Sequence, residues 1–148
     1  MRISSKGRYA LAAVISMAQQ YNGGESITVM SISKRLNLSK IYLEQVFSLL
    51  KRGGIVTSIK GAQGGYQLAR RPEQISVLAV LSAAELSVLE RTEETVLEKA
   101  PDIEGAMRAI VFDELDRSLK AILESITLSD LVMEAEKRKD KSARMYYI

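Results

Sequence analysis

The chain has 148 residues, of which 47% are hydrophobic and 26% charged, so its composition is that of a globular protein and not of a disordered one. It contains no cysteine and no histidine, which excludes disulfides, thiol nucleophiles, imidazole bases and the usual ligands of zinc or iron–sulfur clusters. The net charge of +3 conceals an asymmetry, because residues 1–72 hold 11 basic and 2 acidic side chains, whereas residues 73–148 hold 10 and 16.

Three helices are predicted in the basic half, and each follows a residue that can cap it. The candidate N-caps are Ser4 or Ser5, then Thr28, then Ser39. The first and third helices show apolar residues at the i, i+3, i+4, i+7 spacing of one buried face. Asn22-Gly23-Gly24 ends the first helix, a tight link follows the second near Leu36, and Gly53-Gly54 ends the third.

A β-hairpin is predicted directly after the third helix. The β-branched segment 55–59 is a strand, the glycine-rich segment 60–65 is a turn, and the segment 66–69 is the return strand. Two short helices, a tight link and a hairpin in this order predict a winged helix-turn-helix.

The acidic half is predicted to be helical. Arg70-Arg71-Pro72-Glu73 marks a boundary, because Pro72 cannot donate to a strand ladder and disfavours helix at the residue before it. A fourth helix is expected from Ser76 to about Leu89, and a long fifth helix from Pro101 to about Ser125. Thr127-Leu128-Ser129-Asp130 resembles a capping box that opens a last short helix.

The long fifth helix carries apolar residues spaced 3, 4, 3 and 4, which is the heptad pattern of helices that pack along their length. These residues are Phe112, Leu115, Leu119, Ile122 and Ile126. They predict a dimer seam, and the alternative is that they pack on the core of their own domain. The expected fold is mainly α with a small β-hairpin, divided into a DNA-binding domain (1–72), dimerisation or regulatory helices (73–135) and a flexible tail (136–148).

The polar face of the third helix is the first candidate for contact with DNA. Glu44 can accept a hydrogen bond from the amino group of cytosine, and Gln45 can pair with adenine. The remaining polar candidates of this helix are Lys40, Tyr42, Lys51 and Arg52, of which the last two are placed to hold phosphates. The alternative is an ordinary solvated face, which is less favoured here because a helix-turn-helix precedes this face and a glycine-rich hairpin follows it.

Two further segments are predicted to contact DNA. The start of the first helix offers free N–H groups and nearby cations that suit a phosphate, through Ser4, Ser5, Lys6 and Arg8. The turn of the hairpin is narrow enough to enter a minor groove, through Lys60, Gly61, Gln63, Gly64 and Gly65. The alternatives are simple capping of the helix and a flexible hairpin tip.

Three motifs resemble, in order and spacing, those of the BadM/Rrf-type transcription regulators. They are Ser5-Lys6-Gly7-Arg8-Tyr9-Ala10, Tyr42-Leu43-Glu44-Gln45 and Gly61-Ala62-Gln63-Gly64-Gly65-Tyr66-Gln67-Leu68, and the resemblance covers roughly residues 1–135. It implies a homodimer with crossing long helices and two wings that flank a palindromic DNA site. By this likeness Ser39, Tyr42, Glu44 and Gln45 fall where the family contacts bases.

The chain departs from the cluster-binding members of that family. Those members place three cysteines between the fourth and fifth helices, whereas the corresponding segment 89–107 has none. The resemblance therefore implies no cofactor and points to the cysteine-metabolism repressor branch. That branch also ends in an aromatic pair and isoleucine, similar to Met145-Tyr146-Tyr147-Ile148. In that branch the tail implies binding to O-acetylserine thiol-lyase, and the alternative is a frayed or packed terminus.

These observations together predict a sequence-specific DNA-binding repressor that controls cysteine or sulfur metabolism. We expect a cytoplasmic protein that is not an enzyme, because membrane spans, signal-peptide features and a carboxylate pair in a pocket are lacking in the sequence pattern. The alternatives are an adaptor that uses the winged helix and the tail to bind a metabolic enzyme, and a small enzyme.

Overall fold

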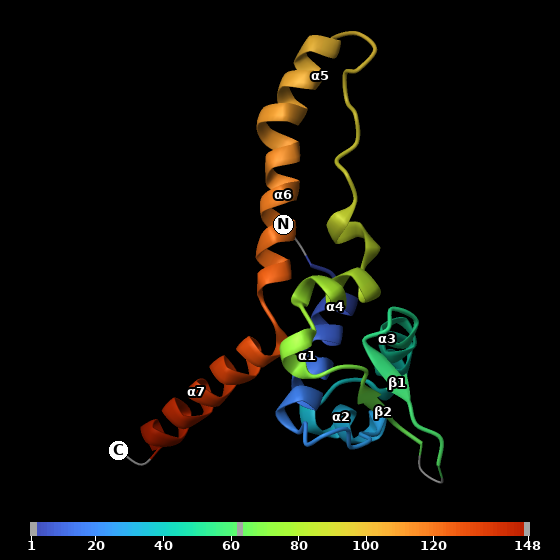
Figure 1. The fold of residues 1–148 in the computed structure, drawn as a ribbon, viewed down its shortest axis with the longest axis vertical. Coiled ribbons are helices and arrows are strands. Elements are labelled where there is room, and N and C mark those ends of the chain that lie inside the picture. Colours follow the sequence, from blue (N-terminus) through green and yellow to red (C-terminus); the bar gives the residue numbers. More distant parts are fainter. Residues whose placement is uncertain (1–2, 62–63, 147–148) are drawn as a thin grey trace.

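The computed structural model describes residues 3–61 and 64–146, and its mainly helical body carries one long projecting rod (Figure 1). The helices and strands are α1 (Ser5–Gln19), α2 (Val29–Leu36), α3 (Lys40–Arg52), β1 (Val56–Ser58), β2 (Tyr66–Leu68), η1 (Pro72–Gln74), α4 (Val77–Ala84), η2 (Leu86–Leu89), α5 (Pro101–Met107), η3 (Arg108–Phe112), α6 (Asp113–Ser125) and α7 (Leu128–Tyr146). In the part of the chain that is described, no helix has the length and apolar character that crossing a membrane requires.

The predicted N-caps form as hydrogen bonds. The side chains of Ser4, Thr28 and Ser39 accept from the backbone N–H groups of Gly7, Ser31 and Tyr42, respectively. The link between α2 and α3 turns at Asn37, whose φ of 54° places it in the left-handed region that asparagine tolerates. The helix-turn-helix is therefore determined by local side-chain chemistry.

The main core lies among α1, α2, α3, the hairpin and α4. Phe47 and Leu50 of α3 and Met17 of α1 are among its fully buried side chains, as the periodicity predicts. The start of α7 closes this core with Leu128, and Leu131 and Val132 pack against it. A second small cluster of Val77, Leu81 and Leu123 joins α4 to α6.

The hairpin is shorter than predicted but is held by an additional pairing. β1 and β2 pair antiparallel with Val56 opposite Leu68. Ile27, just before α2, pairs with Tyr66 through two backbone hydrogen bonds of 2.8 and 2.9 Å. The centroid of the Tyr66 ring also lies 4.8 Å from the centroid of the Phe47 ring. The wing is thus fixed to the helix-turn-helix at its base.

The predicted fourth helix is wrong in its length. α4 ends at Ala84, and Glu85, with an extended φ of −147°, leads into the short turn η2. The carboxylate of Glu85 turns towards the start of α1 and accepts from the N–H of Ser4 with both oxygens at 3.0 Å. A contact with a segment 81 residues away ends this helix, and no local pattern indicates it.

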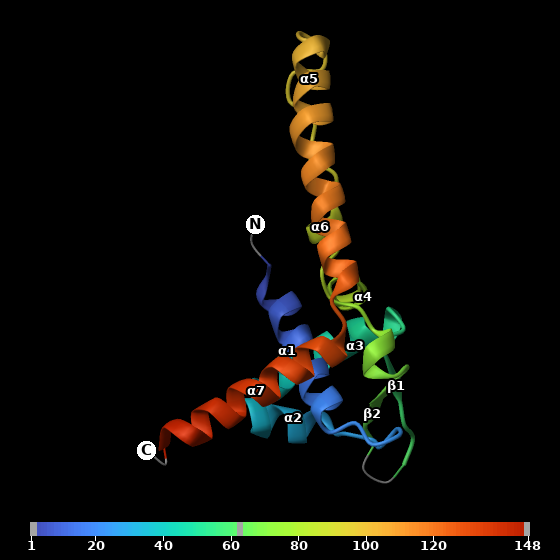
Figure 2. The ribbon, with the colours of Figure 1, turned by 60° about the vertical axis from the view of Figure 1, so that its left-hand side comes forward.

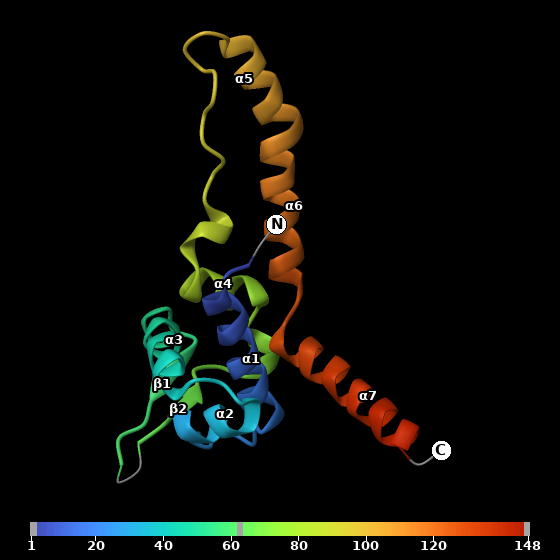
Figure 3. The same ribbon diagram turned by 180° about the vertical axis from the view of Figure 1, so that it is seen from behind.

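The long predicted helix forms from Pro101 to Ser125 but contains a π turn. In η3 the N–H of Asp113 donates to the carbonyl of Arg108, five residues back. Figures 1 and 3 show α5, η3 and α6 as one rod, with the segment between η2 and α5 running beside it. We call that segment, 90–100, the connector.

The last helix is much longer than the short one predicted. The capping box forms, since Thr127 N–H donates to Asp130 at 2.9 Å and Asp130 N–H donates to Thr127 at 3.1 Å. α7 then continues to Tyr146 and points away from the body (Figure 2). The expected tail 136–148 is therefore helical through residue 146, whereas Tyr147 and Ile148 lie outside the described residues.

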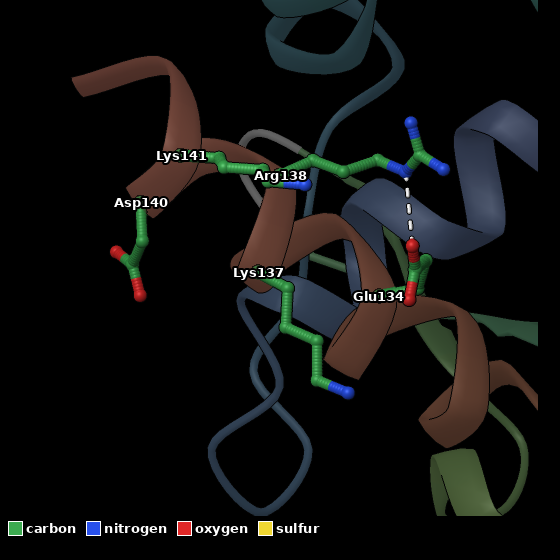
Figure 4. A pocket seen from close by; sticks show the side chains of 5 residues that line it. All are labelled: Glu134, Lys137, Arg138, Asp140 and Lys141. Carbon is green, nitrogen blue, oxygen red and sulfur yellow. Dashed lines mark hydrogen bonds and ion pairs between the residues drawn. The ribbon is translucent and has the colours of Figure 1, made fainter. Parts of the chain in front are cut away.

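Ion pairs within α7 are consistent with its continuation. Figure 4 shows five charged side chains on this helix, with Arg138 Nε donating to Glu134 Oε1 at 3.0 Å. Lys139 lies 3.9 Å from Glu136, three residues earlier. Pairs at i,i+3 and i,i+4 favour the helical conformation of a charged segment. The charge density that indicated a tail therefore supports a helix instead.

Candidate nucleic-acid interface

α3 exposes a continuous polar face opposite its buried stripe. Leu43, Val46, Phe47 and Leu50 are buried, which turns the other side of the helix to solvent. The exposed side chains are Lys40, Ile41, Glu44, Gln45, Ser48, Lys51 and Arg52. Six of these are polar or charged, so the helix presents hydrogen-bonding groups on a rigid element.

Ile41 is the exception on this face, and the sequence analysis did not select it. Its side chain is 72% exposed, although isoleucine is among the residues most often buried. Ile41, Glu44, Gln45 and Ser48 follow the spacing of a single helix face. The same spacing that located the buried stripe could have revealed this exposed apolar residue.

Two of the residues predicted to contact bases, Ser39 and Tyr42, make contacts that stabilise the fold. Ser39 caps α3 with its hydroxyl, at 3.3 Å from the N–H of Tyr42. The ring of Tyr42 is half-buried and meets the ring of Tyr9 edge-on, with centroids 5.0 Å apart and planes at 83°. These contacts fix the start of α3 against α1.

The polar start of α3 also carries an ion pair. Lys40 Nζ lies 3.7 Å from Glu44 Oε1, and both side chains are about half exposed. An exposed pair of this kind contributes little to stability, because water competes for both charges. Each partner can therefore exchange this contact for a group on DNA at small cost.

The start of α1 differs from the prediction in one respect. The N–H of Ser4 donates to Glu85 and that of Gly7 to the Ser4 hydroxyl, so these two groups are not free for a phosphate. The prediction of a free helix terminus is wrong for them, because α4 brings a carboxylate to this end. Arg8 donates to the hydroxyl of Ser5 at 3.1 Å.

The cations at this end nevertheless reach α3. Lys6 and Arg52 line one shallow recess with Leu49 and the end of α4. A second recess, on the other side of α3, is lined by Lys40 and Glu44 together with Thr28 and Gly65 of the wing base. α3 therefore lies between the start of α1 and the wing.

The wing has glycines where its backbone requires them. Gly65 has a φ of 143°, and a β-carbon there would collide with the Ser26 hydroxyl and lie 3.1 Å from the carbonyl of Ile27. Gly64 has a φ of 62°. Lys60 and Gly61 are exposed at the described part of the tip, whereas the predicted candidate Gln63 lies outside the described residues.

A buried ion pair attaches the connector to the rod. Glu104 is 2% exposed, and its Oε1 accepts from the N–H groups of Thr95 and Val96 at 2.6 and 2.8 Å. Arg108 lies 3.9 Å from Glu104 Oε2 and donates to the carbonyl of Thr92 at 3.0 Å. We call Glu104 and Arg108 the connector clamp. The sequence analysis left this segment unassigned.

The predicted dimer seam is divided by the structure. Leu119 and Ile126 pack against the Val77, Leu81 and Leu123 cluster of their own domain. Leu115 and Ile122 are exposed by 62% and 57%. Phe112 is half-buried in the π turn. Packing on the chain's own domain is thus confirmed for Leu119 and Ile126, whereas the dimer seam stays a prediction for the exposed Leu115 and Ile122.

The comparison with protein families decides the assignment. The Rrf2 model, described as an iron-dependent transcriptional regulator, matches residues 3–134. The chain belongs to the Rrf2 family. It is 35% identical to CymR of Bacillus subtilis over 148 residues, which cover 100% of both chains. It is 33% identical to IscR of Aliivibrio salmonicida over 139 residues, which cover 92% of this chain and 80% of that relative.

A solved structure agrees with this assignment. The structure of CymR, the global cysteine regulator of B. subtilis, matches with a TM-score of 0.75 and 34% identity, covering 90% of this chain and 98% of that one. This Rrf2 protein is therefore a DNA-binding transcription regulator with a winged-helix fold, as its motifs predict. Its relatives are regulators and not enzymes.

The iron named in the description of the Rrf2 family does not fit the residues of this member. The chain has neither cysteine nor histidine. Within residues 3–61 and 64–146, no group of three or more potential ligands is placed to hold a metal ion. The buried carboxylate beside the connector, Glu104, is already bound by two backbone N–H groups and faces Arg108. This donor set suits a structural clamp and not a cluster.

Proposed function

We propose that the chain is a homodimeric repressor that occupies a palindromic promoter site, with α3 in the major groove and the wing in the minor groove. The observation that carries this proposal is the exposed polar face of α3, which lies between a cationic helix start and a glycine-rich wing. Because such a regulator acts where the chromosome lies, we place it in the cytoplasm.

Base contacts are assigned to the middle of the exposed face of α3. Gln45 suits adenine, and Glu44 suits the amino group of cytosine once it exchanges its contact with Lys40. Ile41, which is exposed beside them, suits the methyl group of thymine. Ser39 and Tyr42 support these contacts by fixing the start of the helix.

Phosphate contacts are assigned to the cations around α3. Lys6 and Arg52, which share one recess, suit one phosphate segment, with Lys51 and Arg8 beside them. Lys60 and the wing glycines suit the minor groove, because glycine lets the backbone approach closely. In a two-fold dimer the two α3 helices would contact half-sites about 34 Å apart.

Selection of bound DNA from a random pool tests the site assignment. Glu44→Ala is expected to change the preferred bases, because it removes an acceptor aimed at a base edge. Lys51→Ala is expected to weaken binding to all sequences alike and to reduce the slope of log affinity against log salt by about 1. The same selected motif for Glu44→Ala and the parent chain would refute the base contact.

The genes of cysteine or sulfur metabolism are the proposed targets. The full-length similarity to CymR supports this, as does the lack of cluster ligands in the chain. Expression from reporter fusions of such genes should rise when the gene that encodes this chain is deleted. Unchanged expression at every sulfur supply would refute the assignment of targets.

The C-terminal residues are proposed to bind O-acetylserine thiol-lyase as a peptide. α7 carries this end away from the body, and Met145 is 79% exposed (Figure 1). Deletion of Met145–Ile148 should abolish co-purification with the lyase, whereas the substitution Glu98→Gln at an exposed residue of the connector should not. O-acetylserine should compete with the tail, and binding that survives the tail deletion would refute this partner.

An adaptor that uses its winged helix for a partner protein is the second candidate function. The long α7 favours it, because beyond its packed start this helix projects from the body (Figure 3). Linear loss of log affinity for DNA with log salt supports the regulator, since counterions are released from phosphates. If no binding to DNA is detected even at low salt, the adaptor is supported.

A further inference from the structure

The end of α4 contacts the two cationic helix ends that border the recess of Lys6 and Arg52. It meets the start of α1 through Glu85 and the end of α3 through Ala83. The recess between these ends is lined by Lys6, Arg52 and residues 82–84, among others. Figures 1 and 3 show α4 beside the start of α1. One helix end therefore touches both of the segments assigned to DNA phosphates.

Two glycines permit these contacts, because each leaves out a side chain that would block α4. A β-carbon on Gly53, which follows α3, would collide with the side chain of Ala83. A β-carbon on Gly7 would lie 2.5 Å from Oε2 of Glu85 and 3.3 Å from the side chain of Leu81. Neither glycine has a positive φ, so close approach and not backbone conformation requires them.

The carboxylate of Glu85 fixes the start of α1 in this place. Both of its oxygens accept from the N–H of Ser4 at 3.0 Å, and Oε1 also accepts from the hydroxyl of Ser87 at 3.3 Å. A carboxylate is stabilised at a helix N-terminus, because the peptide dipoles leave partial positive charge there. Ile3, just before this cap, packs into the small cluster between α4 and α6. The backbone that carries Lys6 is therefore held by α4.

We propose that Glu85 is a positioning residue for DNA binding. It holds the start of α1 at a set distance from the end of α3, so that Lys6 and Arg52 reach the same segment of phosphates. The inference rests on the proposed phosphate contacts of these two cations. Glu85 acts through Lys6 and not by touching DNA itself.

The carboxylate of Glu85 has two opposite effects on DNA binding. Its negative charge lies at a helix start assigned to phosphates, and like charges repel. Its hydrogen bond to Ser4 orders the backbone before Lys6, so that less freedom is lost when DNA binds. The repulsion is screened by salt, whereas a misplaced cation removes a phosphate contact. Positioning therefore outweighs repulsion, and the sign of the change in affinity tells the two apart.

Four variants of the full chain separate these effects. Glu85→Gln removes the charge but keeps one oxygen that can accept from Ser4. Glu85→Ala removes the acceptor as well. Gly7→Ala keeps the carboxylate but displaces it with a β-carbon. Glu90→Gln, at an exposed residue directly after η2, is the control for loss of charge alone.

Affinity for the selected DNA is measured over a range of salt concentrations. We expect Glu85→Ala and Gly7→Ala to weaken binding about 10-fold or more and to reduce the slope of log affinity against log salt by about 1, because one phosphate contact is lost. Glu85→Gln should lose less, since a neutral acceptor makes a hydrogen bond roughly half as strong. Glu90→Gln should stay within about 3-fold of the parent with an unchanged slope. Circular dichroism checks that each variant is folded, and if Glu85→Ala is not, Gly7→Ala carries the same test.

A double-mutant cycle shows whether Glu85 acts through the cation of α1. In a Lys6→Ala background, Glu85→Ala should change affinity by less than about 2-fold, because the contact that it supports is already gone. A loss of about 10-fold that persists in this background would overturn the inference, since it would reflect a general weakening of the fold.

Two further outcomes would overturn the inference. Tighter binding by Glu85→Ala or Glu85→Gln would show that repulsion is the main effect of the carboxylate. Full affinity in Glu85→Ala or Gly7→Ala would show that the start of α1 needs no fixed position. If Lys6→Ala alone leaves DNA binding unchanged, the proposed phosphate contact itself fails, and this result is seen without any change at Glu85.

Discussion

The carboxylate of Glu104 and the guanidinium of Arg108 lie side by side on one buried face of the rod, with Oε2 and Nη2 3.9 Å apart. Each side chain also binds backbone of the connector, at Thr95 and Val96 for Glu104 and at Thr92 for Arg108. One turn of helix thus fixes a segment that has no regular structure of its own.

The first prediction concerns the connector clamp. Glu104→Gln keeps the shape but removes the negative charge that two N–H groups donate to, so the connector should loosen. Amide hydrogen exchange at Thr95 and Val96 should accelerate at least about 10-fold at pH 7, as charge-assisted hydrogen bonds are roughly twice as strong as neutral ones. Glu98→Gln, at an exposed connector residue, is the control and should change neither amide.

The second prediction concerns pH. The N–H groups of Val96 and Thr95, with Arg108 adding to them, lower the pKa of Glu104 below its ordinary value of 4.5. The stabilisation from this carboxylate is therefore complete above pH 4.5 and is lost as the pH falls through the lowered pKa. The amide chemical shifts of Thr95 and Val96 should titrate with a midpoint below 4.5. A midpoint at or above 4.5 would contradict the clamp.

The third prediction concerns the base of the wing. Gly65→Ala places a β-carbon against Ser26 and the carbonyl of Ile27, in a backbone conformation that alanine rarely adopts. The pairing of Tyr66 with Ile27 should be displaced, and affinity for the selected DNA should fall about 10-fold or more if the wing enters the minor groove. Gly105→Ala is the matched control, since Gly105 lies on α5, outside the wing, and a β-carbon there meets no atom within 4 Å. Equal affinity of the two variants would remove the wing from the interface.

The fourth prediction concerns the cap of α3. Ser39→Ala removes the acceptor for the N–H of Tyr42 and should lower the free energy of unfolding by about 1 kcal/mol in urea denaturation. Ser39→Asp restores the acceptor and should recover this stability. The aspartate should nevertheless weaken DNA binding, because it adds a negative charge beside the phosphates. Full affinity in Ser39→Asp would place residue 39 away from DNA.

The fifth prediction concerns the contact between α1 and α3. A double-mutant cycle of Tyr9→Leu and Tyr42→Leu should give a coupling free energy of about 1 kcal/mol, the usual value for an edge-on aromatic pair. Thermal unfolding measures this term. A coupling near zero would mean that the two rings share burial but no specific interaction.

The helix-turn-helix could be predicted from the sequence because its signals act within a few residues. Ser39 caps α3 through an N–H three residues away, and the stripe from Leu43 to Leu50 buries itself by the period of the helix alone. The capping box of Thr127 and Asp130 is equally local. Its position was predicted correctly, although the helix that it opens proved much longer.

The candidate site was predicted less completely. The polar face of α3 was found, but Ile41 was missed because apolar residues were assigned to the core. Free N–H groups at the start of α1 were predicted, whereas Glu85 occupies that of Ser4. The carboxylate arrives from a segment 81 residues away, and periodicity contains no information about such a partner.

The sequence by itself determined the caps, the helical stripes, the glycine turn and the charge of residues 1–72, since each depends on neighbours in the chain. Only the tertiary structure decided that Leu119 and Ile126 face their own domain while Leu115 and Ile122 face outward. It also decided that Glu104 lies against the connector and that one π turn interrupts the rod. These features arise from packing between distant segments, where several local arrangements of similar energy compete and long-range contacts select one.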